Sequence, residues 1–195
     1  MYRALTWLVL KRGLDPEDEE AIARLVAETN MEVSQPPPGS GGPQGSERCR
    51  IRVDGEDATP HLRTPEVEAG VSLVSRVSAV RRELVRVQRL LAQRGPTVMV
   101  GRDIGTTVLP DADLKVYLEA SREERARRRC RQLSLEGQTP SFDSVLADLE
   151  RRDTIDSSRS ISPLRPAEDA VVIDTDGLSL EGVVEKVLSL VEART

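Results

Sequence analysis

Three short runs of apolar residues place the tightest limit on the fold of this chain. They read TVMVG (97–101), LKVYL (114–118) and AVVID (170–174), and the segments between them carry helical periodicity. Strands buried on both faces are typical of parallel sheets, and their alternation with helices indicates βαβ units. The sequence therefore predicts an α/β fold, a parallel sheet with flanking helices, around one main core. Three strands are few for a sheet of this class, so we expect that one strand of the sheet is missing from these three runs.

Helical patterns fill most of the remaining chain. Residues 1–29 read as two helical pieces, in which Gly13 ends the first and Asp15, with Pro16 after it, caps the second. A long pattern begins after the predicted cap Thr64 and stops at Gly-Pro before the first apolar run. Further helices are predicted from a capping box at Ser121 and Glu124, from the spacing of apolar residues in 140–153, and from the amphipathic end at 178–193.

Residues 31–62 have a different character and are expected to form a small β insertion. MEVSQ is a short strand candidate, and RCRIRVDGED has the alternation and the Asp-Gly pair of a hairpin. The proline- and glycine-rich run between them, 36–46, predicts a flexible loop. The domain organisation expected is thus a core formed by 1–30 and 63–195, with 31–62 as an insert.

Composition excludes several classes of protein. The net charge of −5 argues against a nucleic-acid binder, which needs a basic face. No run approaches the roughly 18 apolar residues of a membrane span. The two cysteines, Cys49 and Cys130, have neither zinc-site nor disulfide-framework spacing. We therefore expect a cytoplasmic protein without a membrane or nucleic-acid partner.

Charged residues follow the first apolar run, at the strand end where ligands bind in parallel sheets. Arg102 and Asp103 are adjacent there and flanked by glycines, Gly101 and Gly105. A salt-bridged turn is the alternative interpretation. A second candidate pair, Ser72 and Arg81, would lie on opposite sides of a straight helix, so both can touch one ligand only if the helix breaks near residues 76–79.

Two arginine groups lie further along the chain. Arg152, Asp156 and Arg159 share one helix face, where a solvated ladder of ion pairs is the alternative to a site. A second group consists of Arg125, Arg128 and Arg129, also on one face. Like charges at this spacing repel one another, so an anion is expected between them at some stage.

Together these segments resemble the bacterial cytidylate kinases over nearly the whole chain. The most specific motif is GRDIGT with PDADLK; YRALTW, DGED, LRTPEV, VRREL, EERARRR, RRDTIDSSR and SPLRPAEDAVVIDT support it. The resemblance implies a P-loop nucleoside-monophosphate-kinase-like sheet and transfer of a phosphoryl group from ATP, with Mg²⁺, to CMP or dCMP. It also implies a monomer, with 31–62 as the monophosphate-binding insert and about 121–140 as the lid.

The resemblance further implies a role for each candidate residue. Ser72, Arg81 and Asp103 would read the cytosine edge, with Arg159 close to the base. The monophosphate would be bound by Tyr2, Arg3 and Arg102, and the ribose by Arg152 and Asp156. Arg125, Arg128 and Arg129, together with Arg102, would neutralise the transferring phosphate. A related kinase specific for another base is the alternative, which activity with UMP or AMP above that with CMP would support.

One element of the family is missing from the sequence. The phosphate-cradling loop GxxxxGK[ST] does not occur, and the chain enters a helix at Met1 with no capping residue before it. Either the record begins at an internal methionine of a complete kinase, or the chain is a truncated, non-catalytic pyrimidine-nucleotide binder. Translating the DNA upstream of Met1 for DGxxGxGKS separates these alternatives. For the 195-residue chain by itself, we expect no appreciable kinase activity.

Overall fold

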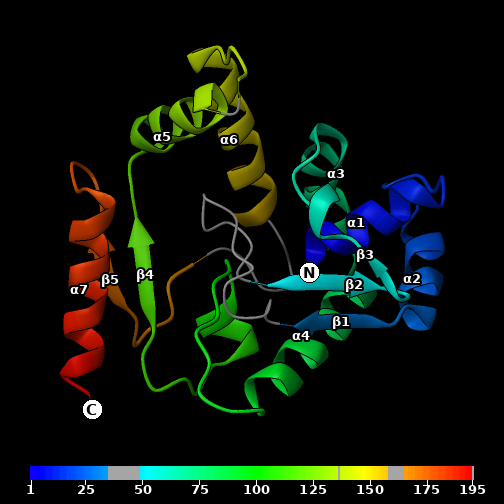
Figure 1. The fold of residues 1–195 in the computed structure, drawn as a ribbon, viewed down its shortest axis with the longest axis horizontal. Coiled ribbons are helices and arrows are strands. Elements are labelled where there is room, and N and C mark those ends of the chain that lie inside the picture. The colour runs from blue at the N-terminus through cyan, green and yellow to red at the C-terminus, as the bar shows by residue number, and fades with distance from the viewer. Residues whose placement is uncertain (35–48, 136, 158–164, 195) are drawn as a thin grey trace. The chain divides into compact units, whose positions relative to one another are not determined.

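The structure is a computed structural model that describes residues 1–34, 49–135, 137–157 and 165–194 (Figure 1). The chain divides into two compact units, Met1–Gly95 and Pro96–Thr195, each of which is described by itself. The predicted flexible loop 36–46 and the predicted base-proximal residue Arg159 lie outside the described residues.

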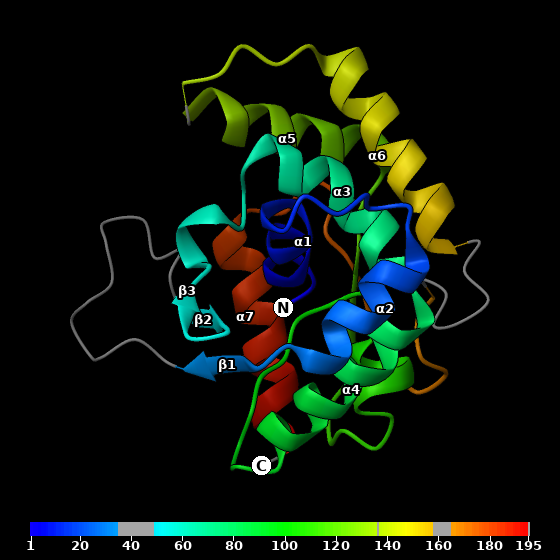
Figure 2. The same cartoon turned by 90° about the vertical axis from the view of Figure 1, so that its right-hand side faces the viewer.

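Unit 1 combines four helices with a small antiparallel sheet. The helices are α1 (Tyr2–Lys11), α2 (Glu19–Glu28), α3 (Pro65–Arg76) and α4 (Ser78–Ala92). The sheet has the order β1 (Met31–Ser34), β2 (Arg50–Val53) and β3 (Glu56–Asp57), followed by the short helix η1 (Thr59–His61). β2 packs against α1, and α2 lies beside α4 (Figure 2).

The predicted β hairpin is confirmed. β2 pairs antiparallel with β3, and the turn between them has φ of 51° at Asp54 and 80° at Gly55. Two consecutive positive φ values are what a two-residue hairpin turn requires, and Asp-Gly is suited to them. At the end of the insert, the ring of His61 stacks on that of Trp7 in α1, with centroids 5.4 Å apart.

The core of unit 1 is aliphatic and lies between α1, α2, α3, α4 and β2. Its fully buried side chains include Leu5, Ile22, Val53, Val74 and Leu84. This composition follows from a sequence with only 2% aromatic residues, in which branched aliphatic side chains have to fill the interior.

The helix ends of unit 1 agree with the sequence at one site and differ at another. Gly13 ends α1 with φ of 68°, and its N–H and that of Leu14 donate to the carbonyls of Leu10 and Val9, a Schellman motif. The prediction that Asp15 caps the second helix is wrong. Asp15 instead accepts from Glu17 N–H in a turn, and Asp18, whose side chain accepts from Ala21 N–H, caps α2.

The predicted break in the long helical pattern is confirmed. α3 ends at Arg76 and α4 begins at Ser78, and Val77 between them has extended backbone angles, φ −63° and ψ 120°. Thr64 is the N-cap residue of α3, as predicted, but its side chain makes no capping hydrogen bond, and Pro65 occupies the first turn.

The described residues of unit 2 form a two-stranded parallel sheet and three α-helices. After the π-helical turn η2 (Ile104–Val108) come β4 (Val116–Glu119), α5 (Arg122–Leu135) and α6 (Phe142–Ser157), then β5 (Val171–Asp174) and α7 (Leu180–Glu192). β4 pairs parallel with β5 in the register Val116 to Val171. Two of the three apolar runs therefore form the predicted parallel pairing, and Figure 1 shows α5 continuing from the carboxyl end of β4.

The third predicted strand, 97–101, is wrong. Residues 97–100 have no regular secondary structure, and the side chains of Val98 and Val100 are 95% and 93% exposed. An apolar run becomes a strand only where a neighbour pairs with its backbone. In the described part of unit 2, the pairing partner of β4 is β5 and not this run.

Candidate functional site

Arg81 lies in the first turn of α4, and its side chain reaches back to the break between α3 and α4. Its side chain is only 3% exposed, and Nη1 donates to the carbonyl oxygen of Ser75 at 3.2 Å. In a continuous helix, this carbonyl would accept from the N–H of Ala79, four residues on. The break at Val77 therefore releases an acceptor that the guanidinium uses, and so it fixes where Arg81 lies.

The predicted residues Tyr2 and Ser72 belong to the same cluster. The guanidinium carbon of Arg81 lies 5.5 Å from the centroid of the Tyr2 ring, within the range of a cation–π contact. Ser72 is 5% exposed, and its carbonyl accepts from the hydroxyl of Ser75 at 3.1 Å. The structure thus brings Tyr2 against Arg81 directly, and it links Ser72 to Arg81 through Ser75, which the sequence analysis missed.

Arg3, predicted to bind the monophosphate, is held by neighbours within unit 1. Its Nη1 donates to Oε1 of Glu68 at 2.9 Å and to the carbonyl of Leu62 at 3.0 Å. The Arg3 side chain is one-third exposed. A phosphate that binds Arg3 would therefore compete with, or share the guanidinium with, the carboxylate of Glu68.

In unit 2, the GRDIGT motif forms the turn η2. Asp103 is 7% exposed, and its carbonyl accepts from the N–H groups of Thr107 and Val108 at 2.9 and 3.2 Å. The neighbouring Arg102 is exposed. The turn presents these two predicted residues in different environments, one buried and one open to solvent.

Lys115, in the motif PDADLK, packs across this turn. A Cβ added at Gly105 would lie 3.2 Å from Cδ of Lys115, so the glycine makes room for the lysine stem. Nζ of Lys115 donates to both carboxylate oxygens of Asp169, at 2.8 and 2.7 Å. This hydrogen bond holds the pKa of the Asp169 carboxyl below its usual value. The contact explains physically why the two motifs occur together.

The three predicted lid arginines lie in α5 and have different partners. Nη2 of Arg125 donates to Asp153 in α6 at 2.6 Å. Arg128 donates to Glu124 and to the hydroxyl of Thr175, each at 2.9 Å, and Arg129 donates to Gln132 at 3.0 Å. The expected anions are supplied for Arg125 and Arg128 by carboxylates of the chain itself.

The predicted ribose residues lie in α6, which also carries Asp153. Arg152 is half-buried, and Asp156 lies in the last turn, with its side chain outside the described part of the structure. α6 therefore carries both the predicted ribose residues and Asp153, the partner of the predicted lid residue Arg125.

Several partners of the predicted residues were missed by sequence reasoning. They are Glu68, Ser75, Lys115, Asp153 and Thr175. The first four lie in or beside recognised motifs, so their place in the sequence was the signal that could have indicated them. Thr175 lies 47 residues from Arg128 and carries no local signal.

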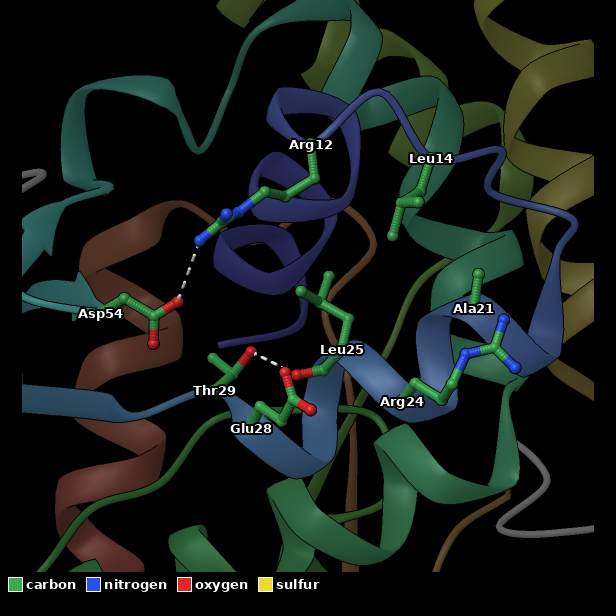
Figure 3. Close-up of a pocket in the computed structure, with 8 residues that line it drawn as sticks. All are labelled: Arg12, Leu14, Ala21, Arg24, Leu25, Glu28, Thr29 and Asp54. Atoms are coloured by element: carbon green, nitrogen blue, oxygen red, sulfur yellow. Dashed lines mark hydrogen bonds and ion pairs between the residues drawn. The ribbon is translucent and has the colours of Figure 1, made fainter.

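A cavity of about 500 Å³ lies elsewhere in unit 1, between the end of α1, α2 and the hairpin turn (Figure 3). Arg12 reaches Asp54 at 3.9 Å across it, and the Thr29 hydroxyl donates to the Leu25 carbonyl at 2.8 Å. None of the predicted site residues lines this cavity. We place the candidate site at the cluster around Arg81, where the polar side chains are buried.

Among the described residues, no helix is long and apolar enough to cross a membrane. Nor do three or more histidine, cysteine or acidic side chains gather in this part of the chain in a way that could hold a metal ion.

Helices and a small parallel sheet define a mixed α/β protein. The family model described as Cytidylate kinase matches residues 1–193. A cytidylate kinase of Bacillus velezensis is 42% identical over 195 residues, which cover 100% of this chain and 83% of the relative. One of Carboxydothermus hydrogenoformans is 43% identical over 191 residues, 98% of this chain and 82% of the relative. The chain belongs to the cytidylate kinase family.

Other relatives are longer proteins. A bifunctional pantoate ligase/cytidylate kinase of Synechococcus sp. (strain JA-3-3Ab) is 49% identical over 190 residues, which cover 97% of this chain and 34% of the relative. The chain therefore spans about a third of the length of such bifunctional relatives.

Proposed function

We propose that this chain acts as a cytidylate kinase, which transfers the γ-phosphoryl group of ATP to CMP or dCMP and forms CDP or dCDP in pyrimidine nucleotide metabolism. The observation that carries the proposal is the burial of Arg81, whose guanidinium lies against the Tyr2 ring and donates to the carbonyl of Ser75 at the helix break. A buried guanidinium fixed by a main-chain carbonyl is a preorganised donor. Family membership supplies the reaction class.

The base would be read by hydrogen bonds from Ser72, Arg81 and Asp103. An aspartate carboxylate accepts from the exocyclic amine of cytosine, and serine and arginine donate to its ring nitrogen and carbonyl. Uracil presents a carbonyl in place of that amine, and a site with buried polar groups left unpaired rejects the wrong ligand strongly. Arg159 completes this proposed set near the base.

The acceptor phosphate and the ribose would be held by separate groups. Tyr2, Arg3 and Arg102 are assigned to the monophosphate, since arginine forks match phosphate geometry. Arg152 and Asp156 are assigned to the ribose, with the aspartate accepting from its hydroxyls. Glu68 would orient Arg3 before the phosphate arrives, because it already accepts from that guanidinium.

Phosphoryl transfer needs positioning and neutralisation of charge rather than covalent chemistry from the protein. Arg125, Arg128, Arg129 and Arg102 are assigned to this neutralisation. Closure of the lid, about 121–140, would exclude water, so that CMP is the nucleophile. Mg²⁺ would arrive on the phosphates of ATP, as part of the donor substrate.

The donor side is where this sequence departs from a complete kinase, because GxxxxGK[ST] does not occur in it. Backbone N–H groups and the lysine of that loop bind the donor phosphates. We therefore infer that the 195-residue chain by itself turns over slowly. The alternative function is that of a non-catalytic pyrimidine-nucleotide binder.

The test follows ATP consumption and CDP formation by the purified chain with Mg²⁺ and CMP, dCMP, UMP or AMP. The expected turnover rate is far below the roughly 1–10³ s⁻¹ of typical enzymes. Of the four monophosphates, CMP and dCMP should be the best acceptors. In thermal unfolding, these two should also raise the melting temperature of the chain most. A rate within the typical range contradicts the inference on the donor side. A preference for UMP or AMP contradicts the assignment of the base.

The remaining parts of the proposal concern partners and location. A protein that does not bind nucleic acid agrees with the net charge of −5, and a monomer that binds small-molecule nucleotides is what the family resemblance implies. A cytoplasmic location agrees with the free state of both cysteines, Cys49 and Cys130.

A further inference from the structure

The ion pair between Arg125 and Asp153 differs from its neighbour on the same two helices. Nη2 of Arg125 lies 2.6 Å from Oδ2 of Asp153, and the two side chains are 34% and 20% exposed. The adjacent pair, Arg122 with Glu150, is 3.3 Å apart, with side chains 63% and 49% exposed. Shielding from solvent strengthens a charge-assisted hydrogen bond. Of these two links between α5 and α6, the one through Arg125 is therefore the stronger.

The guanidinium of Arg125 is not fully satisfied by this pair. Its Nε is buried and has no hydrogen-bond partner among the described residues. A buried donor without an acceptor is unfavourable. The present position of Arg125 is thus stabilised chiefly by one carboxylate, and a ligand with several acceptor oxygens could offer more. The hydrogen bond that Arg125 donates to Asp153 also raises the pKa of Arg125, so the side chain carries its full charge.

Arg128, one turn further along α5, is held in a different way. It donates to the hydroxyl of Thr175, which is itself 3% exposed and donates to the carbonyl of Glu119 at the end of β4. Arg128 also pairs with Glu124 of its own helix, but its link to the sheet consists of neutral oxygens. α5 is therefore fixed to the sheet at Arg128, whereas the partner of Arg125 outside α5 is a carboxylate that another anion can replace.

We propose that Asp153 is a positioning residue that acts as an exchangeable counter-ion of Arg125, occupying its guanidinium in the ligand-free chain until nucleotide phosphates displace it. This inference deepens the proposed function and rests on its assignment of Arg125 to the phosphates. The exchange is one anion for another, with no bond formed or broken. Since Asp153 lies on the helix that carries Arg152 and Asp156, displacement removes the stronger of these two ion pairs between α5 and the proposed ribose helix.

Asp153→Asn removes the competing charge while keeping the size of the side chain. Inorganic tripolyphosphate is titrated calorimetrically into the full chain at low ionic strength. The expected result is affinity about tenfold higher than that of the wild type, since a charge-assisted hydrogen bond no longer has to be broken. The gain should disappear in the double variant Asp153→Asn/Arg125→Gln.

Asp148→Asn is the matched control, because Asp148 is on the same helix, is 66% exposed and pairs with Arg151 at 3.3 Å. It makes the same charge change and should alter tripolyphosphate affinity less than twofold. A second readout uses no phosphate ligand. Phenylglyoxal, which modifies accessible arginines, should react with Arg125 several-fold faster in Asp153→Asn than in Asp148→Asn, as followed by peptide mass spectrometry.

Three results overturn the proposal: equal tripolyphosphate affinities in the two single variants, a gain that persists without Arg125, or unchanged modification of Arg125. Absence of tripolyphosphate binding in every variant also contradicts it, because no anion then competes. Neither CMP nor turnover enters these measurements. A failure of the proposed kinase activity therefore remains distinguishable from a failure of the counter-ion role.

Discussion

The guanidinium of Arg128 donates to Thr175, and the hydroxyl of Thr175 donates in turn to the carbonyl of Glu119 at 2.8 Å. The N–H of Thr175 donates to the same carbonyl at 2.8 Å. Thr175 directly follows β5, and its buried side chain thus joins this end of β5 to the end of β4 and to the helix α5. The position of the proposed lid helix depends on this threonine.

Thr175→Val should therefore destabilise the protein by about 1–3 kcal/mol, because it removes the acceptor of Arg128 Nη1 and one of the two donors to the Glu119 carbonyl. Urea unfolding measures this change. The matched control is Thr154→Val, whose hydroxyl donates only to the Glu150 carbonyl within the exposed face of α6, with an expected effect within about 0.5 kcal/mol. Equal effects of the two substitutions would show that Thr175 does not join these elements.

Arg81→Met should weaken CMP binding at least tenfold, since it removes the buried donor while filling a similar space. A tenfold loss corresponds to about 1.4 kcal/mol. Arg81→Lys should recover part of the affinity, because it restores the charge without the planar fork. Arg82→Met is the control, since the neighbouring side chain is exposed, and it should bind within twofold of the wild type. CMP binding by Arg81→Met within twofold of wild type, in a folded protein, would remove Arg81 from the site.

Gly70→Ala tests the close approach of α1 and α3, which brings Tyr2 toward Arg81. An added Cβ would lie 3.2 Å from Cγ2 of Thr6, and Thr6 is fully buried. Alanine gains up to about 1 kcal/mol in helix propensity, but the fixed β-branched neighbour offsets this gain. In the control, Gly182→Ala, the nearest atom is 3.5 Å away. We expect Gly182→Ala to stabilise the protein relative to Gly70→Ala by about 1–2 kcal/mol in urea unfolding, and the reverse order would contradict this packing.

The pair Lys115 and Asp169 predicts a pH dependence. The pKa of Asp169 is lowered in the folded state by the hydrogen bond from Lys115. Its contribution to stability is therefore present above the pKa of an unfolded aspartate, about 4, and is lost as the pH falls through the lower pKa of the folded state. The melting temperature of the wild type should exceed that of Asp169→Asn at pH 7, and the difference should shrink below about pH 4. Lys115→Met should abolish the pH dependence of that difference, and a difference independent of pH would contradict the role of this pair.

Local patterns predicted much of the fold, and contacts distant in sequence account for the rest. The Asp54-Gly55 hairpin and the break at Val77 were predictable because each depends on neighbouring residues. The strand predicted at 97–101 failed because strand formation depends on a pairing partner elsewhere in the chain. The choice of Asp18 over Asp15 as a helix cap turned on a local competition between two similar residues.

The candidate site divides in the same way. Motifs indicated Ser72, Arg81 and the lid arginines by residue type and spacing. They did not indicate which arginine is anchored and which is exchangeable, because Thr175 and Asp153 approach from elements formed far along the chain. These long-range partners, rather than the arginines themselves, determine how each guanidinium is held.

Calorimetric titration of the 195-residue chain with CMP and then with UMP tests the central claim most directly. It needs no donor nucleotide and depends only on the acceptor site around Arg81. The account predicts that CMP binds about tenfold or more tightly than UMP, because uracil lacks the amine that Asp103 would accept from. Equal affinities for CMP and UMP, or no binding of CMP by the folded chain, would contradict it.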